Sequence, residues 1–228
     1  MLKFFCISIL CFVPDLSSTT PQPRADQWWV DRTAQIQQVV DQEGSRAKVI
    51  FVGDSITQGW EGNGKALWKE HLAPLHAINL GIGGDRTEHV IWRLENGHLR
   101  GLSPEVAVVM IGTNNFGNNL PDEEPEVLAG VVAVVELLKS SLPNVQVLLL
   151  DIFPRGKTFN KMRGSILQVN QTLQTTYEKD DRVTFLPIGH LMIEDDGSIN
   201  PRIMPDFLHL SEEGYQIWFD AISKKCGA

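Results

Sequence analysis

A serine, a histidine and an aspartate stand where each could serve in acyl transfer. Ser55 follows an apolar run directly, and Asp206 and His209 lie three residues apart much later in the chain. An isolated hydroxyl is a poor nucleophile at neutral pH, so Ser55 needs a base, which the imidazole of His209 can provide. Asp206 can fix the tautomer of that imidazole and stabilise its protonated form. The sequence therefore predicts a catalytic relay of Ser55, His209 and Asp206.

Two glycine-containing segments, 81–85 and 112–115, can supply hydrogen-bond donors for an oxyanion. The candidate donors are the backbone N–H groups of Ser55 and Gly84 and the side-chain amide of Asn114. Gly84 has no Cβ, so the main chain can approach a substrate closely there, and one such donor is worth roughly 10²–10³ in turnover. Simpler alternatives exist for each part: the glycines shape a turn, the asparagine caps a loop, the serine begins a helix, and the aspartate–histidine pair lies on the surface.

The elements that must position these residues alternate along the chain. Apolar, largely β-branched runs predict buried strands over residues 47–52, 77–80, 106–111, 145–153 and 183–188. Amphipathic patterns predict helices over residues 26–43, 87–96, 125–140, 159–178 and 211–223. This alternation predicts an α/β fold with three α/β/α layers, whose doubly wound, flavodoxin-like parallel sheet has about five strands. Three candidate site residues each follow a strand, so the carboxyl edge of the sheet should gather them.

Bulk properties restrict the class of partner. With 228 residues and 43% hydrophobic content, the chain can bury a sizeable core. The formal net charge of −8 argues against nucleic acid, which selects basic surfaces. A small-molecule, lipid or glycan ester remains open as a substrate, because local charge matters more than total charge there.

The N-terminal segment has the pattern of a targeting sequence. Lys3 precedes the apolar residues 4–13, Pro14 ends them, and a polar run follows to residue 23. We therefore expect residues 1–23 to be a signal peptide and leader and residues 24–228 to form a single domain, so that the protein is exported to the periplasm or secreted. The alternative is a buried N-terminal strand in a cytoplasmic protein. Nothing after residue 25 is long and apolar enough to span a membrane.

Neither cysteine nor histidine usage indicates a metal or a cofactor. Cys226 is the one cysteine outside the predicted leader, so no internal disulfide is expected in the mature chain. Five histidines show no metal-ligand spacing, and we expect them on the surface or in loops: His71, His76, His89, His98 and His190. We predict no metal site and no cofactor.

With these segments in place, the chain resembles the SGNH (GDSL) hydrolase family. The matching signatures are Gly53-Asp54-Ser55, Gly84 within 81–85, Asn114 within 112–115, and Asp206-Phe207-Leu208-His209. Within that family the likeness is greatest to the catalytic subunits of intracellular platelet-activating-factor acetylhydrolase, from about Val49 to Tyr215. It includes residues 74–80, 89–97 and 154–156.

The resemblance implies a metal-free serine esterase with the three-layer fold and a preference for acetyl and other short acyl groups. It implies a small acyl pocket at Ile56, Thr113 and Leu208, and it implies a homodimer. A pocket walled by Ile56 and Leu208 would exclude long acyl chains sterically.

Two features differ from that subfamily: a longer glycine-rich loop at 58–65 and an N-terminus that looks exported. They leave an extracytoplasmic carbohydrate O-acetylesterase as an alternative to a phospholipid acetylhydrolase. Trp60 and Trp68, which we expect near the mouth of the site, could stack on a sugar or could simply pack inside. An alternative of another class is a noncatalytic binding protein on the same fold.

Overall fold

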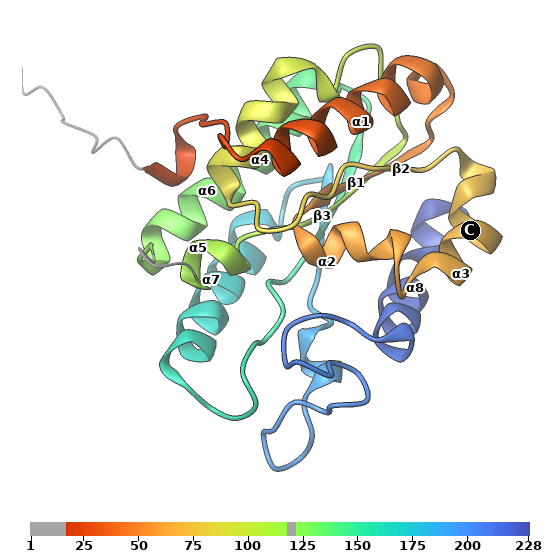
Figure 1. The fold of residues 1–228 in the computed structure, drawn as a ribbon. Helices are drawn as coiled ribbons and strands as arrows, with labels where there is room; N and C mark the ends of the chain where they lie inside the picture. Colours follow the sequence, from red (N-terminus) through yellow and green to blue (C-terminus); the bar gives the residue numbers. More distant parts are fainter. Residues whose placement is uncertain (1–16, 118–121) are drawn as a thin grey trace, which may run out of the picture.

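A parallel five-stranded sheet forms the centre of the protein (Figure 1). The structure is a computed structural model, and it describes residues 17–117 and 122–228. The strands are β1 (Val49–Gly53), β2 (Ile78–Asn79), β3 (Val106–Met110), β4 (Gln146–Leu150) and β5 (Val183–Leu186). Their order is β2-β1-β3-β4-β5, with every neighbouring pair parallel. This is the flavodoxin-like order, which places a ligand-binding edge where β1 and β3 diverge. The predicted fold class is confirmed.

Helices connect the strands as the alternation predicts. They are α1 (Gln27–Glu43), α2 (Ser55–Gln58), α3 (Lys65–Leu67), α4 (Thr87–Arg93), α5 (Thr113–Gly117), α6 (Glu124–Ser141), α7 (Lys161–Tyr177) and α8 (Glu212–Cys226). Side-chain caps begin the longer ones: Asp26 accepts from Trp29 N at 3.1 Å, and Ser211 accepts from Gly214 N at 3.2 Å. Such a cap stabilises a helix by about 1 kcal/mol because it satisfies an N–H that has no partner inside the helix.

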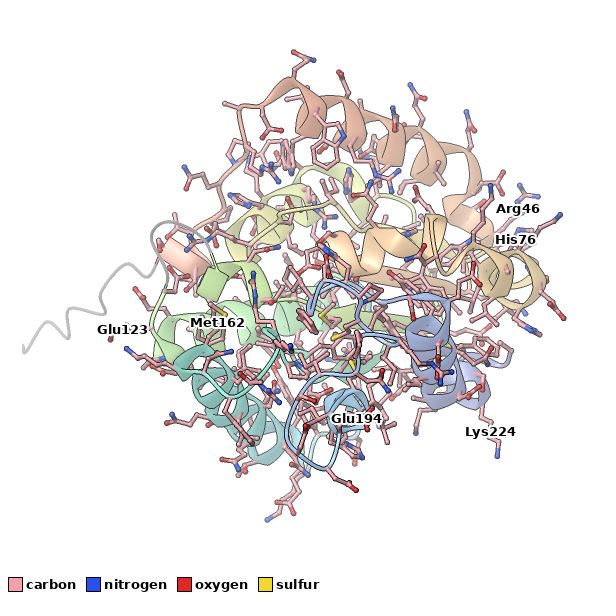
Figure 2. The ribbon with its side chains drawn as sticks, turned by 60° about the horizontal axis from the view of Figure 1, so that its bottom comes forward. Arg46, His76, Glu123, Met162, Glu194 and Lys224 are labelled. Atoms are coloured by element: carbon pink, nitrogen blue, oxygen red, sulfur yellow. The ribbon has the colours of Figure 1, made fainter. Side chains whose placement is uncertain are left out.

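The sheet separates two apolar cores, because successive side chains of a strand point to opposite faces. One face packs against α1, α4, α6 and α7, and its strand residues include Ile50, Val52, Ala107, Val109, Val147 and Leu149. The other face packs against α2 and α8, and its strand residues include Val49, Phe51, Val108, Met110, Leu148 and Leu150. Charged side chains such as Arg46 and Lys224 project outward instead (Figure 2). The three α/β/α layers follow from strands that are apolar on both faces.

The amphipathic pattern predicted that α1 exists, but it did not predict which of its apolar residues are buried. Trp29, Ile36 and Val40 are buried, whereas Val30 and Val39 are 44% and 43% exposed. The buried residues are spaced by seven and four positions, which keeps them on one side of the helix. Val30 and Val39 fall outside that stripe, because α1 covers only one edge of the sheet.

The described part of the predicted leader packs on the sheet's helical layer. Ser18 is fully buried; its hydroxyl donates to Glu126 O at 2.7 Å, and its carbonyl accepts from Thr87 Oγ1 at 2.8 Å. Residues 1–16 lie outside the described residues, so the leader boundary at residue 23 and the single domain from residue 24 stay predictions. Over residues 17–117 and 122–228, no helix has the length and apolar character needed to cross a membrane.

Candidate active site

Ser55 lies at the carboxyl end of β1, as the first residue of the short helix α2. The preceding residue, Asp54, caps this helix by accepting from Ile56 N at 2.9 Å through Oδ1. Asp54 is fully buried, and this burial raises its pKa to about 7 despite the hydrogen bond from Ile56. Asp54 therefore shapes the turn that presents the Ser55 hydroxyl, as expected for a carboxyl that bonds loop amides.

His209 lies opposite Ser55 on the segment that connects β5 to α8. Its Nε2 is 2.9 Å from Ser55 Oγ, although the two residues are 154 positions apart in the chain. Its Nδ1 is 2.6 Å from Asp206 Oδ2. If Nδ1 carries the proton and donates to Asp206, then Nε2 is the acceptor that faces the serine hydroxyl. The structure thus brings all three predicted catalytic residues into one hydrogen-bonded chain.

Asp206 is also tied to the backbone of its own turn. Its Oδ1 accepts from Leu208 N at 3.1 Å and from His209 N at 2.7 Å. Phe207, which lies between Asp206 and Leu208, takes a positive φ of 60°. This left-handed conformation costs a non-glycine residue about 1 kcal/mol or more. Burial pushes the pKa of Asp206 upward, but the hydrogen bonds from His209 and the turn amides outweigh it, so the pKa is lowered. The orienting group is therefore held as a carboxylate.

The loop after β2 brings Gly84 to the same edge of the sheet. Gly81 N donates to Asn79 Oδ1 at 2.9 Å, and Gly83 N donates to Gln58 Oε1 at 2.8 Å. A Cβ placed on Gly83 would lie 3.6 Å from Ser55 Cβ, so this loop runs directly beside the candidate nucleophile. Gly84 has a φ of +76°, which favours glycine, and among the described residues its N–H has no hydrogen-bond partner.

The two asparagines after β3 differ in environment. Asn114 is half-buried at this edge, and its Nδ2 donates to Asp85 O at 2.9 Å, which ties it to the Gly84 loop. Asn115 is fully buried, and its side chain bonds Thr87 N, Thr87 Oγ1 and Asp122 instead. An amide Nδ2 carries two hydrogens, so Asn114 can still donate one to a ligand. The structure therefore ties Asn114, rather than Asn115, to the loop that carries Gly84.

A buried ion pair between Asp85 and Arg93 stabilises the loop that carries Gly84. Asp85 and Arg93 are both fully buried, with Arg93 Nε 2.7 Å from Asp85 Oδ2, and Trp29 Nε1 donates to Asp85 Oδ1 at 2.7 Å. Arg93 also donates to Gly53 O at 2.9 Å, which joins the loop to the end of β1.

His98 lies beside Arg93 and is 1% exposed, so the expectation of a surface or loop position was wrong for this histidine.

The residues expected to form the acyl pocket are chain neighbours of the candidate site residues: Ile56 follows Ser55, Thr113 precedes Asn114, and Leu208 precedes His209. Ile56 is buried, and the half-buried Leu208 packs against the same apolar cluster. Thr113 is also buried, and its carbonyl accepts from Arg155 Nη1 at 3.0 Å. Arg155 was noted in the sequence only as part of the 154–156 stretch, and nothing in that pattern predicted its contact with Thr113.

The tryptophans near the site are arranged differently from the expectation. Trp60 is fully buried and packs edge-on against Phe51 and Trp218, and Trp68 is half-buried against Phe51. A position of Trp60 at the mouth was therefore wrong, because its helical turn faces the core. Trp28, which the sequence did not single out, is an exposed aromatic side chain at this edge.

No cluster of three or more potential metal-ligating side chains occurs within residues 17–117 and 122–228.

Comparison with known proteins identifies the family. The model of the GDSL-like lipase/acylhydrolase family matches residues 51–217, which include every candidate site residue. The chain belongs to this family. As a GDSL-type protein it is a carboxylic ester hydrolase.

Individual relatives extend this result. The alpha2 subunit of rat platelet-activating factor acetylhydrolase IB is 40% identical over 177 residues, covering 78% of this chain and 75% of that protein. The human alpha1 subunit is 38% identical over the same length, covering 78% and 74%. Among solved structures, a GDSL-like lipase from Bacteroides thetaiotaomicron has a TM-score of 0.69 at 21% identity, covering 86% of this chain and 98% of that one. An acetylxylan esterase from Geobacillus stearothermophilus has a TM-score of 0.62 at 19% identity, covering 81% and 95%. At these identities the solved structures show the shared fold alone.

Proposed function

We propose that this GDSL hydrolase is a serine esterase that removes acetyl or other short acyl groups, as the platelet-activating factor acetylhydrolase subunits do by name. The observation that carries the proposal is the continuous chain from Ser55 Oγ through His209 to Asp206, with separations of 2.9 and 2.6 Å. Such a chain can activate a serine at neutral pH without a metal.

In the proposed reaction, Ser55 Oγ attacks the acyl carbon while its proton passes to His209 Nε2. Asp206 keeps the imidazole oriented and stabilises the imidazolium. Collapse of the tetrahedral intermediate breaks the bond to the alcohol oxygen, which takes the proton from His209 and leaves as the free alcohol. Water then loses a proton to His209 and attacks the acyl-serine, releasing the carboxylic acid and restoring Ser55.

The charge that develops on the carbonyl oxygen needs fixed donors. The proposed oxyanion hole consists of the N–H groups of Ser55 and Gly84 and the Nδ2 of Asn114. The bond from Asn114 to Asp85 O supports this assignment, because it holds the asparagine against the Gly84 loop. A donor fixed in advance costs no reorganisation when the charge appears.

The direct test is covalent labelling of the nucleophile. A fluorophosphonate should label the wild-type protein at Ser55, as peptide mapping by mass spectrometry would show, and Ser55→Ala should take up no label. Ser55→Ala should also lose at least 10³-fold in kcat against p-nitrophenyl acetate, with an unchanged circular dichroism spectrum. A folded wild type that takes up no label would favour the noncatalytic binding protein, and labelling at another residue would refute this nucleophile.

A second prediction concerns acyl length. Ile56, Thr113 and Leu208 form the proposed acyl pocket, and Ile56 and Leu208 share one apolar cluster. We expect kcat/KM for p-nitrophenyl acetate to exceed that for the octanoate at least tenfold, because the longer chain has no room. Leu208→Ala should raise the octanoate value relative to the acetate value. Equal rates on both esters would argue against this pocket.

A further inference from the structure

Trp28 is an exposed aromatic ring at the edge of the candidate active site. It lies in the first turn of α1 and is 51% exposed, although the neighbouring Trp29 is buried. Its Cη2 atom is 3.3 Å from the position that a Cβ on Gly83 would take, and that position is 3.6 Å from Ser55 Cβ. The tip of the indole and the nucleophile therefore border the same small space, which exists because Gly83 has no side chain.

The side chain of Arg24 lies at the same edge of the candidate site as Trp28. Its Nη1 donates to Gly83 O at 2.7 Å and lies 3.1 Å from the position of a Cβ on Gly84. Its Nε donates to Asp26 at 3.0 Å, which holds the guanidinium 5.9 Å from the centre of the Trp28 ring. Among the described residues, Nη2 has no hydrogen-bond partner, and the side chain is 24% exposed. A cation with a free donor and an aromatic face thus stand together beside Ser55.

We propose that Trp28 and Arg24 form the subsite for the alcohol part of the ester, and that this alcohol is a carbohydrate. The proposal rests on the esterase function proposed above. A pyranose ring presents a face of C–H groups that can pack on an exposed indole, which is apolar over its ring. The hydroxyls at its rim are acceptors for the free Nη2 of Arg24. Hydrolysis then releases acetate and the deacetylated sugar hydroxyl, which takes its proton from His209.

Arg24 also disfavours a choline headgroup at this place. Quaternary ammonium groups bind well over aromatic rings. Here, however, the Arg24 guanidinium already lies over the Trp28 ring, 5.9 Å from its centre, and Asp26 and Asp85 hold it there at 3.0 and 3.5 Å. The place of a cation over this ring is thus taken by a side chain of the protein itself. A sugar needs only the exposed part of the indole, so this arrangement favours an acetylated glycan over a choline headgroup.

The first experiment measures acetate release from acetylated xylo-oligosaccharides and from ethyl acetate, whose alcohol is too small to cover the indole. Trp28→Ala should lower the ratio of kcat/KM for the sugar to that for ethyl acetate at least tenfold, mainly through KM. Trp28→Phe should restore most of this ratio, because it restores an aromatic face. Leu167→Ala, which removes another exposed apolar side chain on α7, should leave both values unchanged.

The second experiment compares acetylcholine with 3,3-dimethylbutyl acetate, its uncharged counterpart of the same shape. The wild type should prefer the uncharged ester, and Arg24→Gln should reduce this preference at least fivefold. A Trp28→Ala ratio within twofold of the wild type, or a wild-type preference for acetylcholine or for an acetylated choline phospholipid over acetylated sugars, would overturn the subsite. A folded wild type that releases acetate from none of these esters would instead refute the esterase function itself.

Discussion

At the scale of single residues, Asp54 is the most unusual group at the site. It is fully buried next to Ser55, its Oδ1 caps α2, and its Oδ2 has no hydrogen-bond partner among the described residues. Burial disfavours the charged form, which raises the pKa of Asp54 from 3.8 to about 7. A carboxyl with this pKa is largely protonated in mild acid and loses its proton near neutrality.

This shift links stability to pH with a definite sign. The folded protein binds the proton of Asp54 more tightly than the unfolded chain does, so stability falls as pH rises between about 4 and 7. Asp54→Asn cannot titrate and keeps an oxygen for Ile56 N. We therefore expect the free energy of unfolding of Asp54→Asn, relative to the wild type, to increase by a few kcal/mol between pH 5 and pH 8. Urea unfolding at both pH values measures this change, and an equal difference at the two values would contradict it.

A second buried carboxyl, that of Asp151, also makes the stability of the protein depend on pH in that experiment. Burial raises its pKa to about 6, so it should weaken the protein over the same pH range. Asp151 is present in both the wild type and the Asp54→Asn variant. Its contribution therefore cancels when the two proteins are compared at the same pH.

At the scale of elements, the buried pair of Asp85 and Arg93 fixes the Gly84 loop between α1, α4 and the end of β1. Arg93→Met leaves Arg24, whose Nη1 is 3.5 Å from Asp85 Oδ1, as the remaining cation beside the buried Asp85, and we expect it to lower the free energy of unfolding by about 3 kcal/mol, the lower end for a broken buried pair. The matched control is Arg46→Met. Arg46 pairs with Glu43 on the surface and is 57% exposed (Figure 2), so its loss should cost under about 1 kcal/mol. Chemical denaturation compares the two, and equal losses would show that the buried pair does not stabilise the fold.

The sequence predicted the elements better than the contacts between them. The apolar run that ends at Val52 predicts a buried strand, which corresponds to β1. The alternation of strands and helices then leaves few possible topologies, so a shared sheet edge for the segments that carry Ser55, Gly84 and Asn114 could be expected. The Asp85–Arg93 pair could not, because burial of a charge depends on a partner that periodicity does not reveal. Trp28 and Trp29 show the same limit: adjacent and identical, they differ because a rotation of about 100° per residue turns one inward and the other toward solvent.

At the scale of the whole molecule, the proposed chemistry needs no metal. The hydroxyl, imidazole and carboxylate are supplied by the chain, and the proposed oxyanion donors are uncharged amides. We expect dialysis against EDTA to leave the hydrolysis of p-nitrophenyl acetate within about twofold of the untreated rate, since no bound ion would activate the nucleophile. Loss of activity that zinc or calcium restores would refute the metal-free mechanism.

Export and dimerisation remain predictions, which fractionation of the source cells and light scattering of the purified protein can test.

The 154 positions that separate Ser55 from its imidazole partner also have a consequence for synthesis. On a ribosome the hydroxyl emerges early, while the base that activates it has not yet been translated. A nascent chain with several strands already paired would thus carry an inert serine. Esterase activity would begin only when the last loop closes over the sheet, so the growing polypeptide could not attack esters in its surroundings before it is nearly complete.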